Sequence, residues 1–165
     1  MSISEIKDQN WKAEFEALIP YLGHRNWTLV VDKAFPIMSP AGFITLNTHD
    51  TVPNVARYVL ETVNRAEHLN PKIYSDKEFE YLTDSLKENV EKLRTEYKLI
   101  SEKFPFNAIW HETIFPKIAE VAQQFKVVIL KTETTIPYSS LFIELDCGYW
   151  SRKSEAELRE IIKKG

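Results

Sequence analysis

The chain is built around the stretch Gly23-His24-Arg25-Asn26-Trp27-Thr28-Leu29-Val30-Val31-Asp32, a short apolar run with an ionisable side chain beyond each end. The run 28–31 is too short for a helix and rich in β-branched residues, so it predicts a buried strand. Gly23 follows a helical pattern and is expected to end that helix, because glycine tolerates positive φ. His24 and Asp32 bracket the strand, and α/β proteins place ligand pockets at strand ends.

Helical and strand patterns alternate on both sides of this run. Apolar residues at helical spacing predict a first helix from Trp11 to Leu22. After the run we expect a strand at 43–47, a helix entered near Pro53 and a short strand at 71–74. The longest periodic segment runs from Phe79 to Ile100 and predicts one amphipathic helix that packs on the core.

The last third of the chain repeats the alternation. Strands are expected at 126–131 and 141–145, preceded by a helical pattern over 111–124 whose start Pro116 places near its own position. A terminal helix is expected over 151–164, with Ser151 or Ser154 as its cap. Helices alternating with strands indicate a layered α/β fold in a single domain, 1–165.

Composition excludes several classes of function. The chain has 165 residues, a formal net charge of -3 and no basic run, which argues against nucleic-acid binding. No apolar run approaches the roughly 20 residues that cross a bilayer, so no membrane association is expected. Residues 1–8 lack the pattern of a secretory leader, and the single cysteine, Cys147, rules out an internal disulfide. These features predict a cytoplasmic location.

The four histidines are the first candidates for chemistry. His24 and His111 each lie at a boundary between a helical segment and irregular chain, whereas His49 and His68 fit loop or surface roles. The sequence has no closely spaced Cys and His ligands, no G-x-S-x-G and no G-x-G-x-x-G, so neither a metal nor a cofactor is expected. The residues alone favour plainer roles, in which His24 bonds the backbone at a helix end and Asp32 caps a turn.

Three segments, taken together, resemble the family of D-ribose pyranase and L-fucose mutarotase. The first is the Gly-His, the apolar strand and the Asp of 23–32, followed by Phe35-Pro36. The second is the segment 131–140, with Lys-Thr, an acidic turn and Pro137-Tyr138, followed by an apolar strand. The third is the pair His111-Glu112, where ribose-type members keep His-Glu. The three occur in the family's order.

The resemblance implies a three-layer α/β/α domain with a mixed, largely parallel sheet. It also implies a pyranase or mutarotase that interconverts the cyclic forms of a free, ribose-like or fucose-like monosaccharide without any cofactor. His24 and His111 would be the catalytic acid and base. The expected substrate-binding residues are Asp32, Lys33, Tyr138 and Ser140. Two of these depart from the family pattern: Ser140 replaces an Asn, and Lys33 replaces a small residue.

The resemblance further implies self-association into a ring-like homo-oligomer, such as a decamer, with sites near subunit contacts. The segment of about 70–106 is expected to be a helical insertion, and the terminal helix an extension. Two other functions stay open. One is a non-catalytic sugar-binding or regulatory oligomer, which the substitution at Ser140 suggests. The other is a hydrolase or lyase acting on a sugar derivative, which a phosphate or carboxylate bound near Lys33 or Arg25 would indicate.

Overall fold

The computed structural model describes residues 10–165; the segment 1–9, on which the expectation of no secretory leader rests, lies outside the described residues. Six strands form one sheet in the order β2-β5-β1-β6-β3-β4. Their bounds are β1 (Trp27–Val31), β2 (Phe43–Asn47), β3 (Leu69–Asp76), β4 (Phe106–Ile109), β5 (Val127–Lys131) and β6 (Leu141–Cys147).

The sheet is mixed and largely parallel. The pairs β1–β5, β2–β5 and β3–β4 are parallel, whereas β6 runs antiparallel to both of its neighbours, β1 and β3. The helices are α1 (Trp11–Leu18), α2 (Val52–Arg65), α3 (Val90–Lys103), α4 (His111–Val121) and α5 (Arg152–Lys164), with 3-10 turns η2 (Ile19–Tyr21) and η3 (Lys77–Tyr81).

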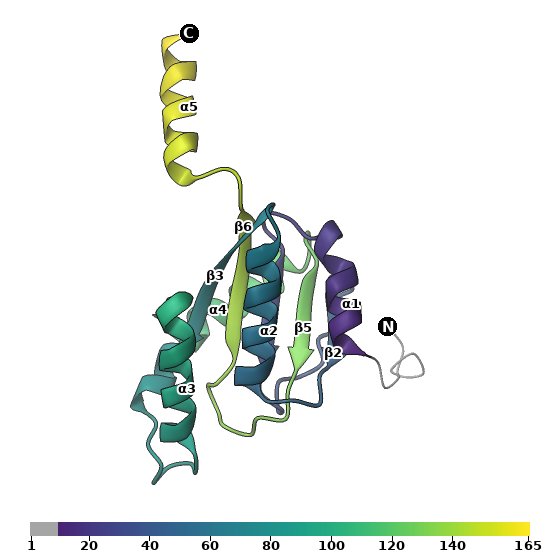
Figure 1. Cartoon of the computed structure of the whole chain (residues 1–165), viewed down its shortest axis with the longest axis vertical. Coiled ribbons are helices and arrows are strands. Elements are labelled where there is room, and N and C mark those ends of the chain that lie inside the picture. The colour runs from purple at the N-terminus through teal and green to yellow at the C-terminus, as the bar shows by residue number, and fades with distance from the viewer. Residues whose placement is uncertain (1–9) are drawn as a thin grey trace.

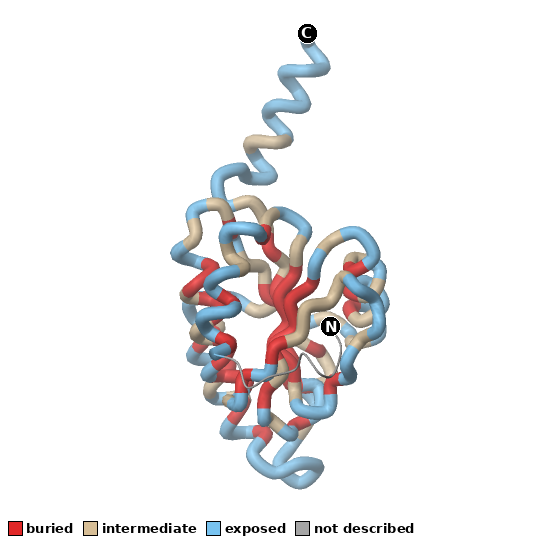
Figure 2. Tube along the Cα trace, turned by 90° about the vertical axis from the view of Figure 1, so that its right-hand side faces the viewer, coloured by how far each residue is buried: buried red, intermediate tan, exposed pale blue. Residues whose placement is uncertain are grey.

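Helices cover both faces of the sheet (Figure 1). Along β1, Val30 packs into a core with α1, α2 and α3, whereas Leu29 and Val31 pack into a second core with α4. Such alternation follows from the two-residue period of a strand, and a strand buried on both faces reads as a continuous apolar run. Figure 2 shows the buried residues concentrated in the sheet, between the helices. The three-layer α/β/α architecture is therefore confirmed.

The long helix expected from Phe79 is shorter than its periodicity suggested. Helix α3 begins only at Val90, because Asn89 adopts a left-handed backbone with φ 69° directly before it. The Asp84 side chain then accepts a hydrogen bond from the Glu91 N–H at 3.0 Å, which favours a turn over a continuous helix. The expectation of core packing is confirmed over the helix that does form, where Val90, Leu93, Tyr97 and Ile100 are buried.

The stretch expected as a helical insertion, 70–106, is only partly helical. It begins inside β3, a strand between β6 and β4, and ends as β4 begins. Strand β4 is an edge strand with no fully buried residue, so its sequence lacks the apolar run that marks β1. Sequence patterns identify such strands poorly, because half-exposed edges carry few apolar side chains.

Two boundaries also differ from the sequence-based expectation. Helix α4 begins at His111 and contains Pro116, although proline was expected to start it. No glycine among residues 10–165 has positive φ, so Gly23 does not adopt the left-handed conformation; Arg25 does, with φ 80°. His24 therefore lies in a tight turn between η2 and β1.

Candidate active site

Three strand ends bring polar side chains into a row at one edge of the sheet. Val30 of β1 and Ser75 of β3 both pair with Leu141, the first residue of β6. One step beyond these pairs lie Asp76, the last residue of β3, and Ser140, the residue before β6. Asp32 follows β1, two residues beyond Val30. Because β6 is antiparallel to both neighbours, its amino end meets their carboxyl ends. The register thus places Asp76 across from Ser140, and hydrogen bonds to Ser140 bring Asp32 to its other side.

Ser140 holds Asp32 in place. Its buried hydroxyl donates to Asp32 Oδ1 at 2.8 Å and accepts from the Asp32 backbone N–H at 3.0 Å. These two contacts fix both the carboxylate and the backbone of a residue that is itself half-buried. Ser140, a short side chain, is therefore already engaged with Asp32.

His111 forms a close pair with a buried carboxyl group. Its Nδ1 lies 3.0 Å from Oδ1 of Asp76, whose side chain is 1% exposed, against 34% for His111. Burial raises the pKa of Asp76 to about 6, against the opposing effect of the His111 charge and hydrogen bond. The His111 backbone N–H also donates to the Glu78 carboxylate, at 3.0 and 3.2 Å. His111 is the first residue of α4, and both its ring and its backbone are therefore held in place.

Tyr138 completes this cluster from the turn before β6. Its ring centre lies 5.7 Å from that of His111 in an edge-to-face arrangement, and the residue is partly exposed. It adopts a left-handed backbone with φ 58°, which is uncommon for a residue with a bulky side chain. Next to it, buried Ser139 donates to the Ile136 carbonyl, and the Ser139 carbonyl accepts from the buried Tyr97 hydroxyl. Helix α3 thus holds the turn that presents Tyr138.

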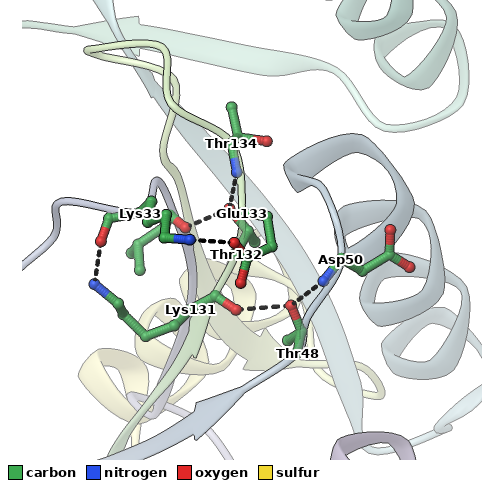
Figure 3. A network of polar contacts seen from close by, with 8 residues as sticks. Lys33, Thr48, Asp50, Lys131, Thr132, Glu133 and Thr134 are labelled. Atoms are coloured by element: carbon green, nitrogen blue, oxygen red, sulfur yellow. Dashed lines mark hydrogen bonds and ion pairs between the residues drawn. The ribbon is translucent and has the colours of Figure 1, made fainter.

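Lys33 belongs to a separate network beside this cluster (Figure 3). Its ammonium pairs with Glu133, and its carbonyl accepts from Lys131 Nζ at 2.7 Å. Thr132 donates to the Val31 carbonyl at 2.7 Å, which ties the end of β5 to the end of β1. Lys33, Lys131 and Glu133 line a cavity of about 400 Å³. The network clamps the loop that carries Asp32 without directing Lys33 toward His111.

His24 lies at the opposite end of β1. Its Nδ1 is 3.0 Å from Asp146 Oδ1, and Lys72 Nζ is 3.0 Å from the other oxygen of the same carboxylate. Strand β1 alone is about 13 Å long at ~3.3 Å per residue, so one chain does not bring His24 to Asp32.

The structure therefore gathers four of the six residues expected in the site, Asp32, His111, Tyr138 and Ser140, and separates the other two. Sequence reasoning missed Asp76 because the strand expected at 71–74 stops two residues short of it. The sequence did hold a usable signal: Asp76, like Asp32, is an aspartate at the carboxyl end of a predicted strand, and such residues meet at the same end of the sheet. Among residues 10–165, no group of three or more His, Cys, Asp or Glu side chains could hold a metal ion.

Searches with protein-family models and among curated protein sequences give no match to this chain. Solved structures do match. Bacillus subtilis RbsD complexed with D-ribose gives a TM-score of 0.53 at 14% identity, covering 86% of this chain and 97% of its own. The fucose mutarotase from Streptococcus pneumoniae, in complex with L-fucose, gives 0.54 at 12% identity, covering 86% and 98%. FucU from Bifidobacterium longum gives 0.52 at 13% identity, covering 81% and 94%.

These matches show that the chain has the fold of the ribose pyranase and fucose mutarotase structures, nearly over their full length. The fold implied by the sequence resemblance is thereby confirmed. At such low identity the likeness extends to the fold and no further. In residues 10–165, none of the helices combines the length and the apolar character that crossing a membrane requires.

Proposed function

We propose that this protein is a pyranase or mutarotase that opens and recloses the ring of a free monosaccharide. The observation that carries the proposal is the pairing of His111 with buried Asp76, in one row with Asp32 and beside Tyr138. The structures with this fold include two in complex with monosaccharides, D-ribose and L-fucose, which supports a small sugar as the ligand.

The reaction needs two proton transfers. One group removes the proton of the anomeric hydroxyl while another protonates the ring oxygen, so that the bond between the anomeric carbon and the ring oxygen breaks; the roles reverse on closing. Above pH 6 the Asp76 carboxylate accepts from Nδ1–H of His111, which leaves Nε2 to exchange a proton with the sugar. Asp32 would accept from a sugar hydroxyl, and Tyr138 would contact the sugar through its ring or hydroxyl.

The second acid or base would be His24 from a second copy. Within one chain His24 is a strand length away from Asp32, yet its side chain is 57% exposed and thus available to a neighbour. A homo-oligomer in which the His24 end of one copy meets the Asp32 end of the next would assemble both roles in one site. This arrangement supplies a physical reason for a ring, since a head-to-tail contact forms a ring when the rotation between successive copies closes.

The test is exchange between anomers of ribose, fucose and a panel of other monosaccharides, followed by NMR saturation transfer. We expect the wild-type protein to accelerate exchange of at least one sugar, and His24→Ala and His111→Ala each to abolish that acceleration. Binding of a sugar without faster exchange would instead establish the non-catalytic sugar-binding function. Absence of both would end the proposal.

Mixing the two inactive variants tests whether the site is shared between copies. If His24 and His111 act from different copies, about one quarter of the sites in a random mixed assembly regain both residues, and activity returns to that extent. If both act from one chain, mixing restores nothing. Light scattering on the same samples gives the size of the assembly, and a fully active monomer would rule out a shared site.

A further inference from the structure

A cavity of about 730 Å³ lies where β6 leaves the sheet and α5 begins, at the end of β1 away from Asp32. Figure 1 shows α5 standing clear of the body at this end of the molecule. The lining includes His24, Asp146, Tyr149, Trp150, Arg152 and Glu155. The volume is within the range of about 300–1,000 Å³ typical of small-molecule sites and leaves room for more than one sugar ring.

The wall of this cavity is anchored to the body of the protein. The Gly148 N–H donates to the His68 carbonyl at 3.1 Å. A Cβ at Gly148 would lie 2.3 Å from the Glu67 carbonyl oxygen and 2.7 Å from that of Leu69, so only glycine permits this close approach. Tyr149 and Trp150 follow directly, which places both aromatic side chains at a fixed point beside β6.

Trp150 is oriented as well as anchored. Its Nε1–H donates to Glu155 Oε2 at 2.7 Å, and Arg159 holds the other oxygen of that carboxylate at 2.8 Å. The Trp150 residue nonetheless remains 45% exposed and Tyr149 73% exposed. An indole fixed through its polar atom and open on its face is suited to an apolar face of a ligand.

The charges around the cavity select the kind of ligand. Three carboxylates line it, those of Glu144, Asp146 and Glu155, together with the cation Arg152; Asp146 is also paired with Lys72 and Glu155 with Arg159. The hydrogen bond from Trp150 and that from Arg159 hold the pKa of Glu155 below its ordinary value. For Asp146, burial acts to raise the pKa, but the Lys72 hydrogen bond and charge and the Cys147 N–H lower it overall. Ionised carboxylates accept from hydroxyl groups, and with their charges balanced by neighbouring cations the lining favours a neutral ligand with many hydroxyl donors.

We infer that this cavity binds a neutral carbohydrate of two or more rings, whose C–H face stacks on Trp150 while its hydroxyls donate to the surrounding carboxylates. A carbohydrate combines the two properties that the lining requires, an apolar ring face and many hydroxyl donors. The inference extends beyond the proposed ring opening of a monosaccharide and shares only His24 with it: the proposed assembly turns His24 toward a neighbouring copy, whereas the carbohydrate stacks on Trp150.

The experiment titrates the full-length protein with methyl α-maltoside, methyl β-cellobioside and trehalose, followed by tryptophan fluorescence and saturation-transfer NMR. These probes are non-reducing and have no anomeric exchange, so their binding is independent of catalysis. We expect at least one to bind, with Trp150→Ala weakening it about tenfold or more and Trp150→Phe, which keeps a ring, only about threefold. Trp110→Ala is the matched control, since Trp110 is 49% exposed and stacks on Tyr81 elsewhere on the surface.

Three results would overturn the inference: no probe binds, Trp150→Ala binds as the wild type does, or Trp110→Ala loses binding equally. Light scattering separates a fourth outcome. If Trp150→Ala changes the mass of the assembly and no glycoside binds the wild type, the cavity receives another copy of the chain instead of a sugar, and the inference fails. The proposed mutarotation would survive each of these results, because it is measured with monosaccharides.

Discussion

The two ends of strand β1 each lie beside a histidine–aspartate pair, and the pairs share one contact distance but differ in burial. His111 and Asp76 are 3.0 Å apart with side chains 34% and 1% exposed; His24 and Asp146 are also 3.0 Å apart, at 57% and 21%. Burial raises the pKa of Asp76 to about 6, whereas Asp146, bonded to Lys72 and more exposed, has a lowered pKa. The surroundings of each pair, more than its contact distance, therefore decide the pKa of its carboxyl group.

This difference assigns separate roles to the two ends. Asp76 is buried and its pKa lies near neutral pH, so its carboxylate can fix the tautomer of His111 and change that role with pH. Such a partner suits a histidine that exchanges protons with a substrate. A partly exposed carboxylate with a lowered pKa, such as Asp146, mainly orients His24 and gains little from its ion pairs. Changes at Asp76 should therefore alter rate and pH dependence strongly, and changes at Asp146 weakly.

The largest expected effect comes from His111→Gln. Loss of a general acid–base group typically lowers a rate by roughly 10²–10⁴-fold, and we expect anomer exchange to fall by at least a hundredfold. His49→Gln, in the loop after β2, serves as the control and should retain nearly full activity. If His111→Gln lowers the exchange rate less than tenfold, His111 is not the acid or base and the reaction takes place elsewhere.

Asp76→Asn should change the pH profile and the stability together. Wild-type exchange should fall as the pH drops below about 6, because protonated Asp76 no longer accepts from Nδ1–H; the variant should be slower and lack that acid limb. A folded-state pKa raised from 3.8 to about 6 destabilises the fold once the carboxyl ionises. The unfolding free energy of Asp76→Asn, relative to that of the wild type, should therefore rise between pH 4 and 6 and level off above pH 6.

That stability difference should grow by about 2–3 kcal/mol between pH 4 and pH 8, as measured by urea denaturation of both proteins across the pH range. Because wild type and variant share every other carboxyl group, their difference isolates the contribution of Asp76. An advantage that instead shrinks as the pH rises would show that Asp76 is stabilised as the anion, in the manner of Asp146, and the contrast between the two ends would disappear.

Tyr97→Phe tests whether α3 supports the turn that presents Tyr138. Removing the hydroxyl leaves the Ser139 carbonyl without its buried donor, and we expect a loss of about 1–2 kcal/mol in unfolding free energy. The strained backbone of Tyr138 should relax, with activity lowered several-fold. Tyr81→Phe, at an exposed tyrosine of η3, is the control and should change neither quantity. If Tyr97→Phe changes neither the crystal structure nor the activity, α3 does not support the turn that presents Tyr138.

The smallest effect is expected for Asp146→Asn. Partly exposed ion pairs contribute about 0–1 kcal/mol, so the unfolding free energy of the variant should lie within about 1 kcal/mol of the wild-type value at neutral pH. Anomer exchange should fall less than tenfold, because Asn can still accept from His24 Nδ1–H. Raising the salt concentration to 1 M should shrink the difference in stability further. An effect as large as that of Asp76→Asn would make the two ends equivalent.

Most of the layered fold could be predicted from local patterns. The apolar runs at β1, β5 and β6 are continuous because each strand is buried on both faces, and the helical periodicity of α2 and α3 reflects burial of one side. Strand β4 escaped prediction because it lies at the edge of the sheet and has no fully buried residue. The break before α3 escaped because the apolar spacing continues through a turn that Asn89 forms with positive φ.

The sequence by itself determined the α/β class, the strand that leads to Asp32, and His111 as a candidate, since these depend on residue type and short-range spacing; the resemblance to a known family added Tyr138. Only the tertiary structure decided which candidates meet. The antiparallel placement of β6 between β1 and β3 joins Asp32, Ser140 and Asp76 in one row, although they lie far apart in sequence. The same placement leaves His24 at the far end of its strand, because strand order and direction are set by packing of the whole sheet.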